Sequence, residues 1–237
     1  MVTGSVGSEP TSSYEMSNAF DDSINDLWSL INHDSACEIY LRSAAQKHDF
    51  AEIRAEALHN DITEFKTNTS IRETIGTLHI EMNFEHGVSS LRSSIEHLAQ
   101  LINEVAKLGL AQTKKQGSNV VDIYKVRDIL LKSPDGNLRK LGELLTSMTG
   151  SGWYTDLSDL RIELFHHQFK RLPRAYALDM SRGSSNVEFL LPSDTAPSIS
   201  DSKERPIDVY LNRQVENVRA VLEQSFKLLI EYLKAKC

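Results

Sequence analysis

Several features that identify common classes of protein are scarce or missing in this chain of 237 residues. It has two cysteines, Cys37 and Cys237, which form neither a disulfide framework nor the paired spacing of a zinc site, so a reducing, cytoplasmic setting is expected. No apolar run approaches the roughly 20 residues that cross a bilayer. Residues 1–10 also lack the charged start and apolar stretch of a signal peptide. The sequence therefore predicts a soluble protein without a membrane partner.

Motifs for the best-known catalytic and cofactor sites are missing as well. The chain has no glycine-rich phosphate loop with its lysine and no strand-to-helix turn that presents a nucleophilic serine. The histidines do not form pairs at helical spacing with a third ligand in view, and His33 with Asp34 is too short a cluster for a metal. We therefore expect neither a metal nor a cofactor.

The charge of the chain limits how it can meet nucleic acid. Acidic residues exceed basic ones, 33 to 26, which gives a formal net charge of −7. This balance excludes a protein that coats nucleic acid over its whole surface, but it leaves room for a local basic site. Hydrophobic residues make up 40% of the chain, which is enough for a globular core.

Most of the chain has apolar residues at the three- and four-residue spacing of amphipathic helices. Ser35 with Glu38 forms a capping-box pattern that separates the first two helices, and Asp49 suggests a further helix start. One run, 78–84, alternates apolar and polar residues and fits either a strand or part of a helix. The predicted helices cover about 20–32, 35–65, 87–108, 120–131, 137–148, 157–172 and 207–235.

These elements predict a mainly all-α fold, an up-and-down helical bundle. Residues 1–16 are expected to be a disordered tail and 17–237 a single domain, because no linker interrupts the middle of the chain. Alternation over 176–180 and 187–191 predicts a small β-hairpin before the C-terminal helix. With the Ser-, Asp- and Pro-rich mobile loop that follows, this insertion spans about 174–206.

The helix predicted over 157–172 has an arginine, Arg161, within its apolar stripe. At about 100° per residue, Leu157, Leu164 and Phe165 all fall within roughly 60° of it. An isolated buried charge is costly, so a guanidinium at this position must meet a carboxylate, a backbone carbonyl, a partner subunit or an anionic ligand. We therefore expect Arg161 to be buried and neutralised by an anion.

Arg161 is followed on the same predicted helix by His166 and His167. An arginine and a histidine separated by four to six residues on one helix are the signature of the HEPN superfamily, which this chain resembles. The run 90–99 is similar to the core helix of several bacterial HEPN-like proteins. The same spacing recurs at four other Arg–His pairs, so the helix context selects Arg161. Over 161–182, five basic residues against two acidic ones predict a local phosphate-binding surface.

The resemblance implies a metal-independent endoribonuclease of toxin or defence type. In such an enzyme the ribose 2′-hydroxyl attacks the adjacent phosphate, whose oxygens Arg161 would hold. His166 would move the proton, with His167 as the second acceptable position. The resemblance also implies a homodimer with paired motif helices, RNA as substrate and an antitoxin-like partner protein. The basic residues expected to contact the RNA backbone are Lys170, Arg171 and Arg174.

Interpretations without catalysis remain open beside this one. In the first, Arg161 pairs with a core carboxylate such as Glu96, which would set the helix register and do no chemistry. In the second, the chain is a helical module for dimerisation or for binding a nucleotide or a partner. The second is favoured by the acidic overall charge and by Ile162, which stands where many active HEPN motifs have a polar residue.

Overall fold

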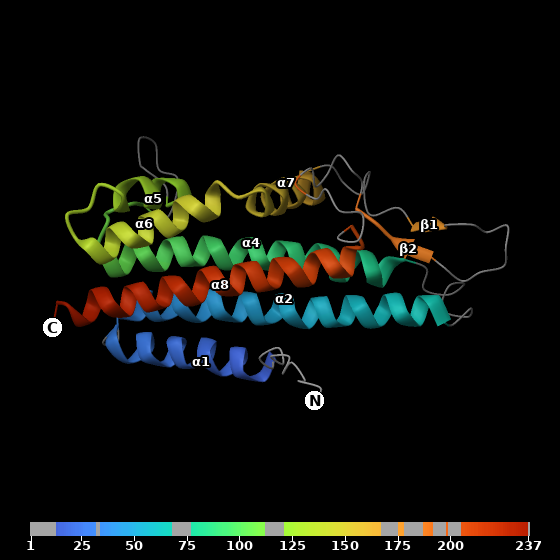
Figure 1. Ribbon diagram of the computed structural model, residues 1–237, viewed down its shortest axis with the longest axis horizontal. Helices are drawn as coiled ribbons and strands as arrows, with labels where there is room; N and C mark the ends of the chain where they lie inside the picture. The colour runs from blue at the N-terminus through green and yellow to red at the C-terminus, as the bar shows by residue number, and fades with distance from the viewer. Residues whose placement is uncertain are drawn as a thin grey trace, which may run out of the picture.

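Long helices form almost all of the structure (Figure 1). The computed structural model describes residues 13–31, 34–67, 77–111, 121–166, 175–177, 187–191, 198 and 205–236. The helices are α1 (Ser13–Leu30), α2 (Ser35–Thr67), α4 (Leu78–Ala106), α5 (Ile123–Leu130), α6 (Gly136–Thr149), α7 (Gly152–His166) and α8 (Ile207–Lys234). The strands are β1 (Ala175–Ala177) and β2 (Val187–Phe189).

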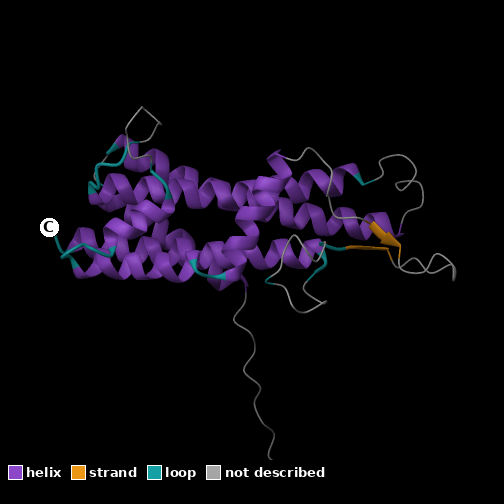
Figure 2. Ribbon diagram, turned by 90° about the horizontal axis from the view of Figure 1, so that it is seen from above, coloured by secondary structure: helices purple, strands orange, loops and turns teal. Residues whose placement is uncertain are grey.

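Successive long segments run in opposite directions along the bundle (Figure 1). Helix α2 reverses the direction of α1, and α4 runs back beside α2. The consecutive helices α6 and α7 then lead the chain away from the α4 C-terminus, and α8 returns. Seen from above, the strands lie at one end of the bundle and the C-terminus of α8 at the other (Figure 2). The prediction of a mainly helical bundle is confirmed. No helix in the described ranges combines the length and the apolar character needed to cross a membrane.

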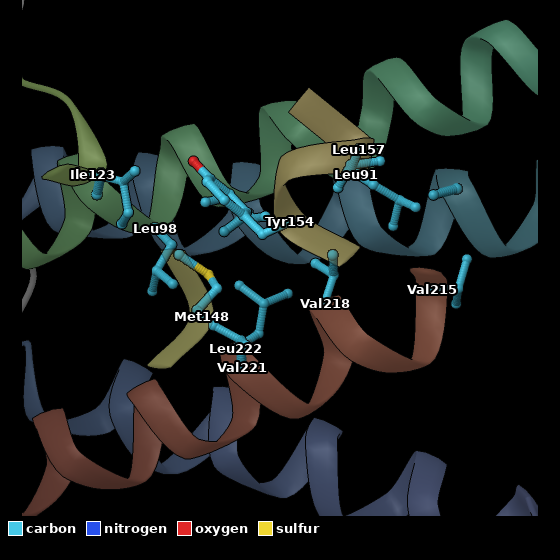
Figure 3. Close-up of a cluster of buried hydrophobic side chains, with 14 of the residues drawn as sticks. Leu91, Leu98, Ile123, Met148, Tyr154, Leu157, Val215, Val218, Val221 and Leu222 are labelled. Atoms are coloured by element: carbon cyan, nitrogen blue, oxygen red, sulfur yellow. The ribbon is translucent and has the colours of Figure 1, made fainter. Parts of the chain in front are cut away.

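Helix α4 is the central element of the bundle and contacts α2, α5, α7 and α8. Its predicted apolar stripe is buried throughout, from Val88 to Val105. Figure 3 shows part of the resulting core, in which side chains from α4, α5, α6, α7 and α8 meet. The labelled residues are Leu91, Leu98, Ile123, Met148, Tyr154, Leu157, Val215, Val218, Val221 and Leu222. The spacing of apolar residues thus predicted which face of α4 is buried.

Aspartate side chains cap three of the helices. Asp34 Oδ1 accepts from the Ala36 and Cys37 amides at the start of α2, at 3.1 and 3.3 Å. Asp122 and Asp135 cap α5 and α6 in the same way. Such caps satisfy amides that have no partner inside the helix. The capping-box prediction therefore located the start of α2 correctly, but the cap is Asp34 and not Ser35.

Residues 78–84 are helical, so the strand interpretation of this run is wrong. Its alternating apolar residues are also two pairs at the four-residue spacing of a helix face. Ile80 and Phe84 point into the core at 2% and 0% exposure, whereas Leu78 and Met82 lie on an exposed face of α4. A period of two over so few residues cannot separate the two structures, and packing against α2 decided for the helix.

Other predicted boundaries changed by a few residues. The helix start proposed at Asp49 is wrong, because α2 runs without interruption from Ser35 to Thr67. Helix α7 begins at Gly152, five residues before its predicted start. Of the predicted tail, residues 1–12 lie outside the described part of the chain, and residues 13–16 belong to α1.

The β-hairpin predicted before the last helix is not confirmed. Residues 175–177 and 187–189 pair as two antiparallel three-residue strands, with Tyr176 opposite Glu188. The predicted turn and most of the predicted mobile loop lie outside the described residues. Leu190 forms an isolated bridge with Pro206, which brings this segment to the start of α8.

A glycine in α6, Gly142, allows the end of α5 to pack closely against it. A Cβ atom at Gly142 would lie 2.9 Å from the backbone nitrogen of Leu131 and 3.1 Å from Leu130 Cβ. We expect Gly142→Ala to lower the free energy of unfolding by about 1–3 kcal/mol, although alanine favours a helix over glycine by about 1 kcal/mol. Gly136→Ala is the control, since a Cβ there meets no atom within 4 Å. Urea unfolding that shows Gly142→Ala to be as stable as Gly136→Ala would contradict this packing.

Candidate functional site: an arginine pair on α4 and α7

Arg161 lies at the edge of the buried face of α7 and not at its centre. The core positions of this helix are Tyr154, Leu157 and Leu160, which are at most 4% exposed. The Arg161 side chain is 36% exposed, and Ile162 beside it is 50% exposed. The guanidinium is therefore buried only at Nε and not as a whole, because the packed stripe of α7 is rotated toward Leu157 and Leu160. Arg161 is accessible from solvent.

Two arginines converge on one carboxylate oxygen at the α4–α7 contact. Arg161 Nη1 lies 3.5 Å from Glu96 Oε1, and Arg92 Nη1 lies 3.7 Å from the same oxygen. Arg92 and Glu96 are four residues apart on α4, so they share a face of that helix. The side chains of Glu96 and Arg92 are 41% and 16% exposed. Among Arg161, Arg92 and Glu96, two positive charges and one negative charge lie together on a partly exposed surface.

The buried aromatic ring of Tyr154 contacts Arg92, one member of this cluster. The Arg92 guanidinium lies 5.4 Å from the centre of the Tyr154 ring, close enough for a cation–π contact. Burial raises the pKa of the Tyr154 hydroxyl, so this ring stays neutral. On the next turn of α4, His97 stacks on Tyr40 of α2 with ring centres 6.3 Å apart. Arg92 is thus held on its apolar side while its charged end reaches Glu96.

His97 is a histidine near the cluster whose imidazole is described. Burial lowers its pKa, which favours the neutral ring at neutral pH. It follows Arg92 by the same spacing that separates Arg161 from His166. His97 packs toward α2, however, whereas Glu96 faces α7. The Arg92–His97 pair therefore does not converge on one point.

The start of α7 is held by a buried carboxylate. Asp156 is 1% exposed and accepts a hydrogen bond from the Ser198 hydroxyl. Burial raises the pKa of this carboxyl group. A Cβ on Gly152 would lie 2.5 Å from Ser198 Cβ, so the first turn of α7 also passes close to Ser198. These contacts fix the helix that contains Arg161 against the segment before α8.

The other predicted site residues are placed only in part. His166 is the last residue of α7, so it shares a helix with Arg161 as predicted. The remaining residues predicted for catalysis or RNA contact lie outside the described residues: His167, Lys170, Arg171 and Arg174. The structure therefore joins Arg161 to Glu96 and Arg92 and leaves the roles of the histidines as predictions.

Arg92 was not assigned a role from the sequence, although it belongs to the 90–99 run that resembles HEPN core helices. Its spacing to Glu96 is the ordinary spacing of a helical ion pair, and such pairs are common on solvated faces. Only the contact between α4 and α7 places Arg161 on the same carboxylate. Local spacing could suggest the Arg92–Glu96 pair within α4, but it could not show that Arg161 of α7 joins it.

Apart from this ion-pair cluster, the described residues contain a group of ligating side chains that is close enough to hold a metal ion. It consists of His48, Asp49 and Glu52 of α2, whose candidate ligand atoms lie within 4.8 Å of one another. The sequence did not indicate this group, because its four-residue spacing joins a histidine to a glutamate and not two histidines.

Comparisons with known proteins do not extend this description. No protein-family model, no curated protein and no solved structure matches the chain. The geometry of its own residues is therefore the basis for a functional proposal.

Proposed function

We propose that this chain is a HEPN-type protein that binds RNA through Arg161 and Arg92 and cleaves it without a metal ion. The observation that supports this best is the convergence of two guanidiniums on one anionic oxygen, at 3.5 and 3.7 Å, on a partly exposed surface. Arginine is well suited to bind phosphate because its planar fork can donate two parallel hydrogen bonds. A phosphodiester group would take the place that the Glu96 carboxylate now holds.

Glu96 has a definite part in this proposal. A carboxylate between two guanidiniums keeps the like charges from repelling each other and orients both groups before RNA arrives. Glu96 then competes with phosphate, and RNA must exchange places with it.

The chemistry would follow from Arg161 and the histidine of the motif. The ribose 2′-oxygen attacks the adjacent phosphorus, the bond to the 5′-oxygen breaks, and the products are a 2′,3′-cyclic phosphate and a 5′-hydroxyl. Arg161 stabilises the negative charge that grows on the phosphoryl oxygens. His166 takes or gives the proton, with His167 as the reserve position. A neutral histidine is suited to this task near pH 7 because its usual pKa is about 6.5.

Helix geometry supports a cleft made by two copies of the chain. Residues five apart on a helix are separated by about 140° around its axis and about 7.5 Å along it. Arg161 and His166 therefore do not easily reach the same phosphate from one α7. The exposed side chain of Ile162 beside Arg161 suits a surface that packs on a second copy. We propose a homodimer in which each chain supplies an arginine to the partner's histidine.

The homodimer is tested by changing Ile162. Ile162→Asp should convert a dimer into a monomer in gel filtration with light scattering, without loss of thermal stability. Leu164→Asp is the poorer probe, because Leu164 packs against the core and its replacement would disturb the fold. A wild-type chain that is monomeric at all concentrations would contradict the shared cleft.

Cleavage is tested with end-labelled RNA in the presence of EDTA. The wild-type chain should produce fragments that end in 2′,3′-cyclic phosphate, and the variant Arg161→Ala/His166→Ala/His167→Ala should not. Absence of fragments, or equal cleavage by the triple variant, would remove the enzyme proposal.

A second function is favoured by one specific observation. The Arg161–Glu96 ion pair joins α4 and α7 inside one chain, which is also the arrangement of a purely structural arginine. In that case the chain is a non-catalytic helical module for dimerisation or for binding a nucleotide or partner protein. RNA that binds with an affinity unchanged by Arg161→Ala would support this alternative.

A further inference from the structure

A second group of ionisable side chains lies on α2, close to α1 and α8. His48, Asp49 and Glu52 place candidate ligand atoms within 4.8 Å of one another. His48 and Glu52 are four residues apart and project from the same face of α2, with Asp49 adjoining them. Together they offer one imidazole nitrogen and two carboxylates, a donor set that suits divalent transition metals.

The imidazole of His48 is fixed in the form that binds metals. The side chain is 0% exposed and packs on Phe20, with ring centres 5.3 Å apart. Its Nε2 lies 3.1 Å from the carbonyl oxygen of Val215. A carbonyl only accepts hydrogen bonds, so Nε2 bears the proton and donates it. Burial lowers the pKa of His48, so the ring is neutral and Nδ1 has a free lone pair.

That Nδ1 atom points into the cluster without a hydrogen bond. It is buried, it has no hydrogen-bond partner in the described part of the chain, and it lies 4.0 Å from Asp49 Oδ1. A buried polar atom without a hydrogen-bond partner needs an explanation, and a bound ion or water is one that applies where ligand atoms gather around it. This atom is the observation, independent of the two carboxylates, that indicates a ligand.

The Asp49 carboxylate can move toward such a ligand. The side chains of Asp49 and Glu52 are 61% and 35% exposed, so Asp49 can change rotamer without disturbing the core, whereas Glu52 is held by Arg219. The negatively charged side chains of Glu52 and Asp21 repel the Asp49 carboxylate. A cation at this point would relieve that repulsion.

Outer contacts hold two of the three candidate ligands, as they do in established metal sites. The carbonyl of Val215 holds the far nitrogen of His48, and Arg219 donates to Glu52 Oε1. Both partners come from α8. In protein metal sites the second nitrogen of a ligating histidine and the ligating carboxylates are commonly hydrogen-bonded in this manner.

We propose that His48 Nδ1, Asp49 and Glu52 bind one divalent transition-metal ion, with Zn²⁺ as the reference ion and water completing its coordination. Bonds of about 2.0–2.2 Å place two ligands of one Zn²⁺ roughly 3–4 Å apart, so the present separations need only a small closure of the exposed side chains. The site lies on α2 and is supported by α8, whereas Arg161 is on α7. The proposal is therefore independent of RNA cleavage, which is tested in EDTA.

The site is tested by calorimetric titration of Zn²⁺ into the full chain, prepared without an affinity tag and stripped with a chelator. We expect one ion per chain, a higher melting temperature with Zn²⁺, and an affinity at least about tenfold lower in Asp49→Asn. Glu56→Gln is the matched control, because it removes one negative charge from an exposed position on the next turn of α2 and should bind Zn²⁺ like the wild type.

X-ray absorption at the zinc edge then identifies the ligands. One imidazole nitrogen with oxygen ligands, and no sulfur, supports the site and excludes the buried Cys37 as a ligand. The proposal is overturned if Zn²⁺ shows no saturable binding, if Asp49→Asn binds as tightly as the wild type, or if sulfur is found among the ligands.

Discussion

Replacing Arg161 by alanine is expected to lower the rate of RNA cleavage by about 10²- to 10³-fold, which is the usual effect of removing one donor to a growing negative charge. Arg161→Lys should restore only part of the rate, because an ammonium group keeps the charge but not the planar fork. Arg139→Ala on the exposed face of α6 is the matched control and should cleave at the wild-type rate. Single-turnover cleavage of a labelled RNA measures all three.

Measuring the stability of the variants distinguishes a loss of catalysis from a loss of folding. An ion pair as exposed as Arg161–Glu96 contributes at most about 1 kcal/mol, so Arg161→Ala should stay folded at 25 °C. Glu96→Gln removes the competitor for phosphate and should bind RNA at least as tightly as the wild type. If Glu96→Gln loses binding as fully as Arg161→Ala, or if Arg161→Ala unfolds the protein, the arginine acts on the fold and not on RNA.

Phe226→Ala is expected to have the largest effect on stability, a loss of about 3–5 kcal/mol in the free energy of unfolding. The ring is fully buried and stacks on Phe20, with ring centres 6.0 Å apart, so it fastens α1 to α8. Truncation removes its apolar contacts and leaves a cavity, because the surrounding helices can close over it only in part. The loss is large compared with the usual stability of a domain, about 5–15 kcal/mol.

Phe50→Ala is the matched control for that substitution. The same atoms are removed, but Phe50 is 36% exposed on α2 and its ring packs under the Arg54 guanidinium. Its replacement should cost about 1 kcal/mol or less. Urea unfolding curves of both variants provide the comparison. Equal shifts of the two midpoints would show that α1 is not fastened to the bundle through Phe226.

The apolar spacing predicted the helices well because that signal is local. The stripe of α4 from Val88 to Val105 and the break between α1 and α2 were both recognised from neighbouring residues alone. The strand interpretation of 78–84 was wrong because a local pattern over so few residues fits both a strand and a helix. Four alternating residues satisfy both periods, and only the burial of Ile80 and Phe84 distinguishes them.

The candidate site was predicted less completely than the fold. Arg161 was selected from its position in the helix, and Glu96 was named as its alternative partner; the ion pair between them is present. The degree of burial was wrong, because a helix drawn from sequence shows which residues share a face but not how that face is rotated against its neighbours. Arg92 was missed because its importance depends on a contact between α4 and α7.

Propensity, capping and periodicity act over a few residues, so the amino-acid sequence alone predicts that this chain is helical, where most of its helices lie and, for α4, which face is buried. The tertiary structure decided the rest. It brought Arg92 and Arg161 to one carboxylate, and it buried His48 against Val215 so that one nitrogen of its ring faces Asp49. Both arrangements join residues far apart in the chain, and only the packing of whole helices could place them together.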